Sequence, residues 1–96
     1  MNLLYSLDAV EDLGRLREFI EIHNPIAAHQ ISVKLIEGIT NLVDNPKIGH
    51  PVPKAPDPEK IRDIIIGDYI VRYILHKNSI VILRIWHHRE DRQKDF

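Results

Sequence analysis

The stretch IVILRIWHHRED, residues 80–91, joins an apolar run to a cluster of polar and titratable side chains. Residues 80–87 are rich in β-branched and aromatic residues, which favours a strand with much of its surface buried. The polar cluster begins with His87 and His88 and continues through Arg89. The stretch therefore predicts a core strand followed directly by polar groups.

Two further strands are predicted immediately before it. Residues 61–66 and 69–76 are also rich in β-branched residues, and Gly67-Asp68 supplies a turn between them. Lys77-Asn78-Ser79 supplies the next turn. Three strands joined by two tight turns predict an antiparallel meander.

Two amphipathic helices are predicted in the first half of the chain. The first begins at Asp8, which has capping-box spacing to Glu11, and ends near His23. Asn24-Pro25 begins the second, because Asn is a strong N-cap and Pro is favoured at the first helical position. The second helix ends at Asn45-Pro46. So tight a connection predicts an antiparallel helix hairpin.

The remaining segments complete one domain, residues 1–96. Residues 2–6 are interpreted as a short first strand, and residues 44–60 hold five of the six prolines, which predicts a stiff linker within the domain. The predicted fold class is α+β, with the order β-α-α-β-β-β. The helix hairpin is expected to pack on one face of a twisted antiparallel sheet, which leaves the other face or its rim for any chemistry.

Composition narrows the function classes. The chain has no cysteine, which excludes disulfides and thiolate metal sites, and its net charge is −1. No signal peptide and no apolar run long enough for a membrane span are recognised, so we expect a soluble cytoplasmic protein. We predict no cofactor and no metal site. Residues 1–59 are acidic and residues 60–92 mildly basic, which indicates either two kinds of partner or an unevenly charged solvated surface.

The ordered motifs of the chain resemble the ParE/RelE superfamily of toxins from type II toxin–antitoxin modules, and specifically its ParE-like, plasmid-stabilisation branch. The resemblance covers nearly the whole sequence. It is carried by Asn24-Pro25 with Ala28, Asn45-Pro46 with Gly49, Arg62 before Gly67-Asp68-Tyr69, Val71-Arg72-Tyr73, and the ending Leu83-Arg84-Ile85-Trp86-His87-His88-Arg89. No single motif is specific to this superfamily, but the occurrence of all of them in this order in so short a chain is specific. The resemblance implies a RelE/ParE-like fold.

The resemblance also implies that the last core strand delivers polar groups to the place where target or antitoxin is engaged. The candidates for these contacts are Arg62, Arg72, Arg84, His87, His88 and Arg89. The alternative for the arginines is ion pairing with Asp63, Asp68, Glu90 or Asp91. His87 and His88 are adjacent in a strand, so we expect them on opposite faces, His87 with Val81, Leu83 and Ile85, and His88 with Arg84 and Trp86. The aromatic residues Tyr69, Tyr73 and Trp86 suit either base stacking or core packing.

Two functions from different classes follow from the resemblance. ParE-type relatives bind and inhibit DNA gyrase without catalysis, and RelE-type relatives are messenger ribonucleases that use basic side chains and often a C-terminal tyrosine. This chain has no tyrosine after Tyr73 and is near neutral, which favours a gyrase-binding toxin without catalytic residues over a nucleic-acid-binding ribonuclease. A decayed toxin that survives as a binding module is a third possibility.

A toxin of either type requires a cognate antitoxin. The off-stripe apolar residues Val10, Ile22 and Val33 are predicted to line a groove along the helix hairpin that accepts an amphipathic helix of the antitoxin. The alternative is that these three are isolated surface hydrophobic residues. The basic sheet region is predicted to attract an acidic segment of the same partner.

Overall fold

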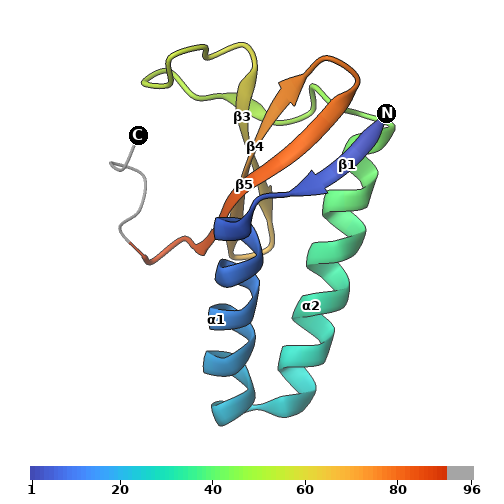
Figure 1. The fold of residues 1–96 in the computed structure, drawn as a ribbon. Helices are drawn as coiled ribbons and strands as arrows, with labels where there is room; N and C mark the ends of the chain where they lie inside the picture. Colours follow the sequence, from blue (N-terminus) through green and yellow to red (C-terminus); the bar gives the residue numbers. More distant parts are fainter. Residues whose placement is uncertain (91–96) are drawn as a thin grey trace.

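In the computed structural model, two long helices pack against one face of a five-stranded sheet (Figure 1). The structure describes residues 1–90. The helices are α1 (Leu7–His23) and α2 (Pro25–Thr40), followed by a short 3₁₀ turn η1 (Asn41–Val43). The strands are β1 (Asn2–Tyr5), β2 (His50–Pro51), β3 (Ile61–Ile66), β4 (Tyr69–His76) and β5 (Ser79–His87). The predicted α+β class with a helix hairpin on a sheet is confirmed.

The N-cap of the first helix lies two residues before the one that the capping-box pattern predicted. Ser6 is the N-cap, because its side chain accepts a hydrogen bond from the backbone N–H of Ala9 at 3.0 Å. The same hydroxyl donates to the carbonyl of Leu83 on β5 at 2.9 Å. Asp8 therefore lies inside the first turn, where a carboxylate is still favourable beside the helix N-terminus.

The junction between the helices is as the sequence predicted. Asn24 caps α2 by accepting from the backbone N–H of Ala27 at 3.1 Å, and Pro25 is the first helical residue. The backbone N–H of Asn24 also donates to the carbonyl of Ile20 at 2.7 Å and closes α1. One residue thus ends one helix and begins the next, which forces the tight hairpin seen in Figure 1.

The sheet is mixed, and this corrects the prediction of an antiparallel sheet. The strand order is β1-β5-β4-β3-β2, and β1 pairs with β5 in parallel, from Asn2 beside Ser79 to Tyr5 beside Ile82. The other pairs are antiparallel as predicted. The parallel pair arises because the helix hairpin and three strands intervene between β1 and β5, which frees β1 to run in the same direction as its neighbour.

A bulge in β5 changes which of its side chains face the helices. Tyr73 pairs with Ile82, whereas Arg72 pairs with Arg84, so Leu83 is an extra residue without a partner on β4. The regular alternation predicted for the strand is therefore wrong. Val81 and Leu83 do not share the face of Ile85 and His87.

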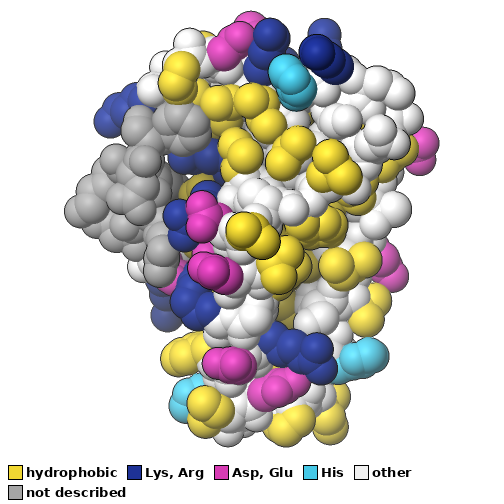
Figure 2. Space-filling model, viewed as in Figure 1, with side chains coloured by type: hydrophobic (Ala, Val, Ile, Leu, Met, Phe, Trp, Pro, Cys, Tyr) yellow, Lys and Arg dark blue, Asp and Glu magenta, His cyan; other side chains and the backbone are white. Residues whose placement is uncertain are grey.

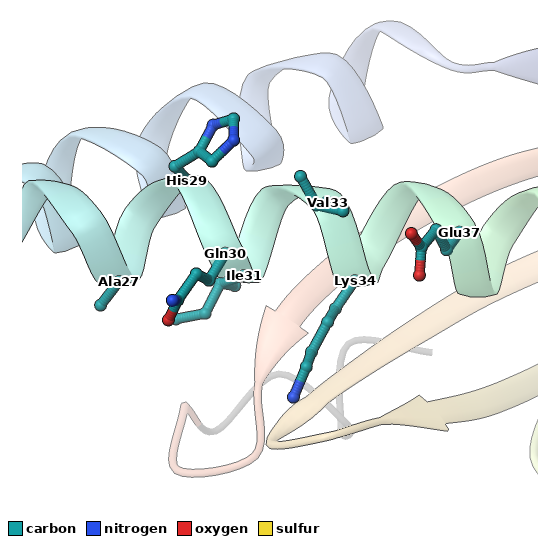
Figure 3. A pocket seen from close by; sticks show the side chains of 7 residues that line it. All are labelled: Ala27, His29, Gln30, Ile31, Val33, Lys34 and Glu37. Carbon is teal, nitrogen blue, oxygen red and sulfur yellow. The ribbon is translucent and has the colours of Figure 1, made fainter.

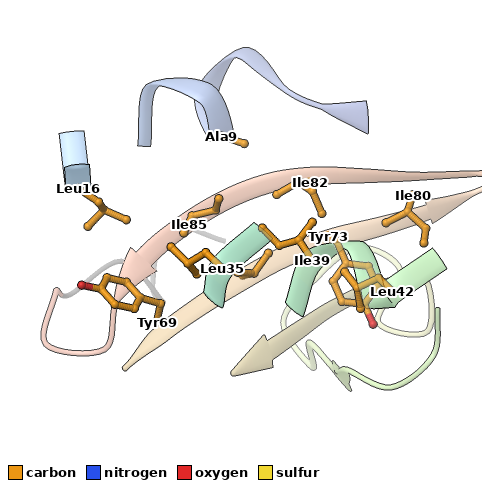
Figure 4. Packing of buried hydrophobic residues seen from close by; sticks show 11 residues of the cluster. Ala9, Leu16, Leu35, Ile39, Leu42, Tyr69, Tyr73, Ile80, Ile82 and Ile85 are labelled. Carbon is orange, nitrogen blue, oxygen red and sulfur yellow. The ribbon is translucent and has the colours of Figure 1, made fainter. Parts of the chain in front are cut away.

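The core lies between the helices and the sheet (Figure 4). Its buried members are Ala9, Leu16, Leu35, Ile39, Leu42, Tyr69, Val71, Tyr73, Ile80, Ile82 and Ile85. A second, smaller cluster covers the opposite face of the sheet, where Val52 and Ala55 pack on Ile61, Ile74 and Leu83. The proline-rich segment is thus more than a linker, because it contributes strand β2 at the sheet edge and shields part of this face.

Candidate functional site

β1 covers the first part of the edge of β5. Beyond β1, side chains of α1 lie along this edge. Asp12 is buried, with 4% of its surface exposed, and one of its oxygens accepts from the backbone N–H of Ile85 at 2.9 Å. The same oxygen accepts from Nε of Arg84 at 2.9 Å. The other oxygen accepts from Nη2 of Arg84 at 3.2 Å and lies 3.5 Å from Nη2 of Arg15. A carboxylate therefore occupies the place of a neighbouring strand.

These contacts lower the pKa of Asp12 below its ordinary value. Burial is the largest single influence and acts in the opposite direction, because it disfavours the charged carboxylate. The hydrogen bonds from Arg84 and from the N–H of Ile85, together with the charges of Arg84 and Arg15, outweigh that cost. The carboxylate is ionised at neutral pH as a consequence.

The turn after β5 is fastened to α1 by a second carboxylate. Glu90 accepts from Nη1 of Arg15 at 2.6 Å through one oxygen and from the backbone N–H of His87 at 2.9 Å through the other. Arg15 also reaches the carbonyl of Ile85 at 3.4 Å. The positions of His87 and Glu90 are therefore set by contacts that involve α1, a helix from the other half of the chain.

Arg62 is placed away from the other sheet arginines. It pairs in register with Tyr73, so it lies on the helix face of the sheet, and it is buried beneath the segment before β2. Its guanidinium donates to the backbone carbonyls of Glu59, Lys47 and Gly49 at 3.0, 3.2 and 3.0 Å. These contacts assign Arg62 to holding the loop against β3.

Arg72 lies on the sheet face opposite the helices and is only 5% exposed. It forms a two-pronged ion pair with Asp63, with distances of 2.8 and 2.9 Å, and its guanidinium stands over the ring of Trp86 at 5.1 Å. The pairing of Arg72 with Asp63 follows the ion-pair alternative from the sequence. Arg84 pairs with Asp12 within residues 1–90, and Asp12 is an acid that this alternative did not include.

The two adjacent histidines lie together, which corrects the expectation that they occupy opposite faces. Their rings stack with centroids 4.6 Å apart, because β5 ends at His87 and the chain turns at once. His87 also makes an edge contact with Tyr69, and its Nδ1 accepts from the backbone N–H of Arg89 at 3.1 Å. In the neutral ring the proton must then be on Nε2, which makes that nitrogen a donor.

A cleft of about 600 Å³ opens where α1 meets the end of β5. Its lining residues are Arg15, Leu16, Phe19, Ile20, Tyr69, His87, Arg89 and Glu90. The structure thus brings two of the predicted residues, His87 and Arg89, into one concave site. Arg62 lies under the loop, and Arg72 and Arg84 do not line the cleft.

The Tyr69 side chain forms one wall of this cleft. Its hydroxyl points away from the hydrophobic cluster in Figure 4. Burial raises the pKa of Tyr69, and the negative charges of Asp68 and Glu90 raise it further. The hydroxyl stays protonated at neutral pH and is available as a hydrogen-bond donor.

The three residues predicted for a hairpin groove are all exposed, but they do not form one surface. Val10 is 53% exposed and shares a side of α1 with Gly14 and Arg17. Val33 is 41% exposed and lines a shallow hollow along α2 (Figure 3). Hydrophobic side chains gather between the two helices in Figure 2. Ile22, which is 80% exposed, lies instead on the side of α1 that carries Phe19.

The sequence reading missed the network of Asp12, Arg15 and Glu90. One signal was present for Asp12, which stands between Ala9 and Leu16 on the apolar stripe of the helix, where an acid must find partners if it is buried. For Arg15 and Glu90 there was no local signal, because their pairing joins residues that are 75 positions apart.

Within residues 1–90, no three His, Cys, Asp or Glu side chains are grouped so that they could hold a metal ion. In the same range, no helix is long and apolar enough to cross a membrane.

Comparison with known proteins gives consistent matches over nearly the whole chain. A family model described as the ParE toxin of the type II toxin–antitoxin system parDE matches residues 3–92. Toxin RelE1 of Caulobacter vibrioides is 31% identical over 93 residues, which cover 95% of this chain and 97% of that protein.

Two solved structures share the fold. A chain of the chromosomal ParDE system from P. aeruginosa has a TM-score of 0.77 at 22% identity, covering 91% of this chain and 95% of its own. The solution structure of a conserved hypothetical protein from Helicobacter pylori has a TM-score of 0.61 at 16% identity, covering 94% and 97%. At these identities the likeness concerns the fold alone.

Proposed function

The chain belongs to the ParE toxin family of type II toxin–antitoxin systems, and on that premise we propose that it inhibits growth by binding DNA gyrase and is neutralised by a cognate antitoxin. The gyrase target is what the ParE-like resemblance implies. The proposal assigns no catalytic step to the protein, and its action is that of a binding inhibitor.

The observation that favours a binding inhibitor over a ribonuclease is that the sheet arginines are already bound to other groups of the protein. A ribonuclease must offer cations to the scissile phosphate and to the charge that develops in the transition state. Here Arg62 is bound to three backbone carbonyls, Arg72 to Asp63, and Arg84 to Asp12. Breaking the buried pair of Arg72 with Asp63 leaves an uncompensated charge and costs about 3–5 kcal/mol. These arginines therefore support the domain and are poor candidates for a phosphate site.

The antitoxin is expected to engage the surface between the helices. Val10 and Val33 are exposed there, and Ile36 of α2 is 47% exposed as well. Apolar residues on two adjacent helices form the kind of groove into which an amphipathic helix packs. Ile22 is not part of this surface, because it lies on the other side of α1.

The target is tested by inducing the protein in bacteria and following labelled thymidine and labelled methionine incorporation in parallel. We expect DNA synthesis to fall first, and we expect purified protein to inhibit plasmid supercoiling by gyrase. Early loss of protein synthesis with cleaved messages contradicts gyrase as the target. Growth without any defect identifies a decayed toxin.

A messenger ribonuclease remains the second candidate, and one observation favours it. His87, Tyr69 and Arg89 line one cleft, and an imidazole, a hydroxyl and a guanidinium are groups that can move protons and hold a phosphate. Replacing His87 with Ala distinguishes the two functions. Loss of RNA cleavage with retained antitoxin binding supports the ribonuclease, whereas unchanged growth inhibition supports the binding toxin.

A further inference from the structure

We infer that the cleft between α1 and the end of β5 is a docking site for a peptide segment in which an acidic side chain neighbours an aromatic one. The site is separate from the surface between the helices that we assign to the antitoxin helix. The inference concerns binding by the isolated protein and does not depend on which target the toxin has.

The cleft has the size and the walls of a binding site. Its volume of about 600 Å³ lies within the usual range of ligand pockets, and it far exceeds what an inorganic anion fills. Leu16, Ile20 and Tyr69 supply apolar surface, and Phe19 adds an aromatic ring that is 66% exposed. A partner that covered Phe19 would remove that ring from water, which is a favourable contribution to binding.

The polar groups of the cleft select for an anion. Two arginines and one glutamate line it. Both oxygens of Glu90 are hydrogen-bonded, one to Arg15 and the other to the backbone of His87. Arg89 is exposed, and no contact of its guanidinium is found with another side chain among residues 1–90. With the Nε2–H of His87 and the hydroxyl of Tyr69, it offers donors to a carboxylate.

The apolar surface continues beyond the cleft, which favours a peptide over a small free acid. Ile22 follows Phe19 by three positions, so both lie on the same side of α1, and Ile22 is 80% exposed. A small molecule that filled the cleft would leave Ile22 uncovered. A chain segment that places its carboxylate at Arg89 and its aromatic ring at Phe19 extends naturally along this side of the helix.

The test uses the full-length protein, labelled with ¹⁵N, and the blocked dipeptide N-acetyl-Asp-Phe-amide as the probe. Amide shifts are followed up to roughly 10 mM peptide, a range suited to the weak affinity of a short segment. We expect saturable shifts at Arg15, Phe19, Tyr69, His87 and Arg89. We also expect affinity at least about fivefold higher than for the Asn-Phe and Asp-Ala analogues, which lack the charge and the ring.

Matched variants locate the contacts. Arg89→Gln and Phe19→Ala should each weaken the probe by about tenfold, because one removes a charge-assisted hydrogen bond and the other an aromatic contact. Arg17→Gln and Leu7→Ala are the controls, since both residues are exposed on α1 outside the cleft, and they should leave affinity unchanged. Unchanged amide spectra away from the substituted position show that each variant is folded.

Three outcomes overturn the inference. The first is the absence of saturable shifts at the cleft. The second is an effect of Arg17→Gln as large as that of Arg89→Gln, which indicates general charge attraction. The third is tighter binding of phenylacetate than of the dipeptide, which makes the occupant a free acid. None of these results bears on growth inhibition, so they leave the proposed function to its own test.

Discussion

The carboxylate of Asp12 holds together separate parts of the chain, because it bonds to the backbone of β5 and to the guanidinium of Arg84. Replacing Asp12 with Ala removes the acceptor of the N–H of Ile85 and two hydrogen bonds of Arg84. We expect the free energy of unfolding to fall by about 2–3 kcal/mol, as measured by urea denaturation. Glu11→Ala removes an exposed acid next to it and should change stability by less than about 0.5 kcal/mol. Equal effects of the two substitutions would contradict the role of Asp12.

The free energy of unfolding should depend on pH through the ionisation of Asp12. Its pKa is lowered in the folded protein, so the unfolded chain takes up a proton at a higher pH than the folded protein does. The stability that Asp12 contributes is therefore fully present above its unfolded pKa, and it is lost as the pH falls through the folded pKa. Between about pH 5 and the lower folded value, the difference in unfolding free energy between wild type and Asp12→Asn should shrink toward zero. A constant difference across that range would exclude this linkage.

At the scale of elements, two glycines in the helices allow the effect of helix propensity to be compared with the effect of side-chain packing. A Cβ at Gly14 on α1 meets nothing within 4 Å, so Gly14→Ala should stabilise the protein by up to about 1 kcal/mol. A Cβ at Gly38 on α2 would lie 2.6 Å from Cδ1 of Ile66 on β3. Gly38→Ala should lose most or all of that gain, because the side chain of Ile66 must shift to make room for the added methyl group. Thermal melts of the two variants measure the difference in their stability. Equal stabilisation would show that the side chain of Ile66 moves aside at no cost.

The bounds of most elements were accessible from the sequence because local chemistry sets them. The predicted strands 61–66 and 69–76 match β3 and β4, and Gly67 in the turn between them has a φ of 60°. Asn24-Pro25 likewise marks the helix junction. The parallel partner of β1 and the bulge at Leu83 were not accessible, since each depends on pairing between distant residues and on how side chains fill the core.

The residues of the candidate site likewise divide into those that the sequence could identify and those that it could not. His87 and Arg89 could be named from the sequence because they stand at the end of a recognisable core strand. The cleft that contains them could not, because Phe19 and Arg15 reach it from α1, and only the packing of that helix along β5 brings them together. The ion pair of Arg84 with Asp12 was hidden for a related reason, because 72 positions of the chain separate the two residues. Asp63, the partner of Arg72, is close in the chain and was among the acids that the sequence offered.

At the scale of the whole molecule, the apolar surface between the helices should dominate antitoxin affinity. Val10→Asp combined with Val33→Asp should weaken antitoxin binding by more than about tenfold, or roughly 1.4 kcal/mol, because charges would be buried in the groove. Ile48→Asp is a matched control at a 52% exposed position in the segment between η1 and β2. Isothermal titration calorimetry measures both. An affinity loss confined to Ile48→Asp would place the antitoxin elsewhere.

The same titrations should carry a signature of folding on contact. An antitoxin segment that becomes helical as it binds covers much apolar surface on both partners, and this gives a large negative heat-capacity change. A heat-capacity change near zero, with full affinity retained, would indicate that the partner docks as a preformed body through polar contacts.

The pairing of β1 with β5 has a consequence for the order in which the chain can fold during synthesis. Among residues 1–90, the strand that pairs with β1 is β5, and the backbone N–H that Asp12 binds belongs to Ile85 of the same strand, so both contacts wait until β5 has been made. A nascent chain that stops before Ser79 can form its helices and the β3–β4 hairpin, but it lacks the strand that both β1 and α1 require. A truncated product that stops before Ser79 should therefore be inert and easily degraded, so that growth inhibition requires β5 to have been synthesised.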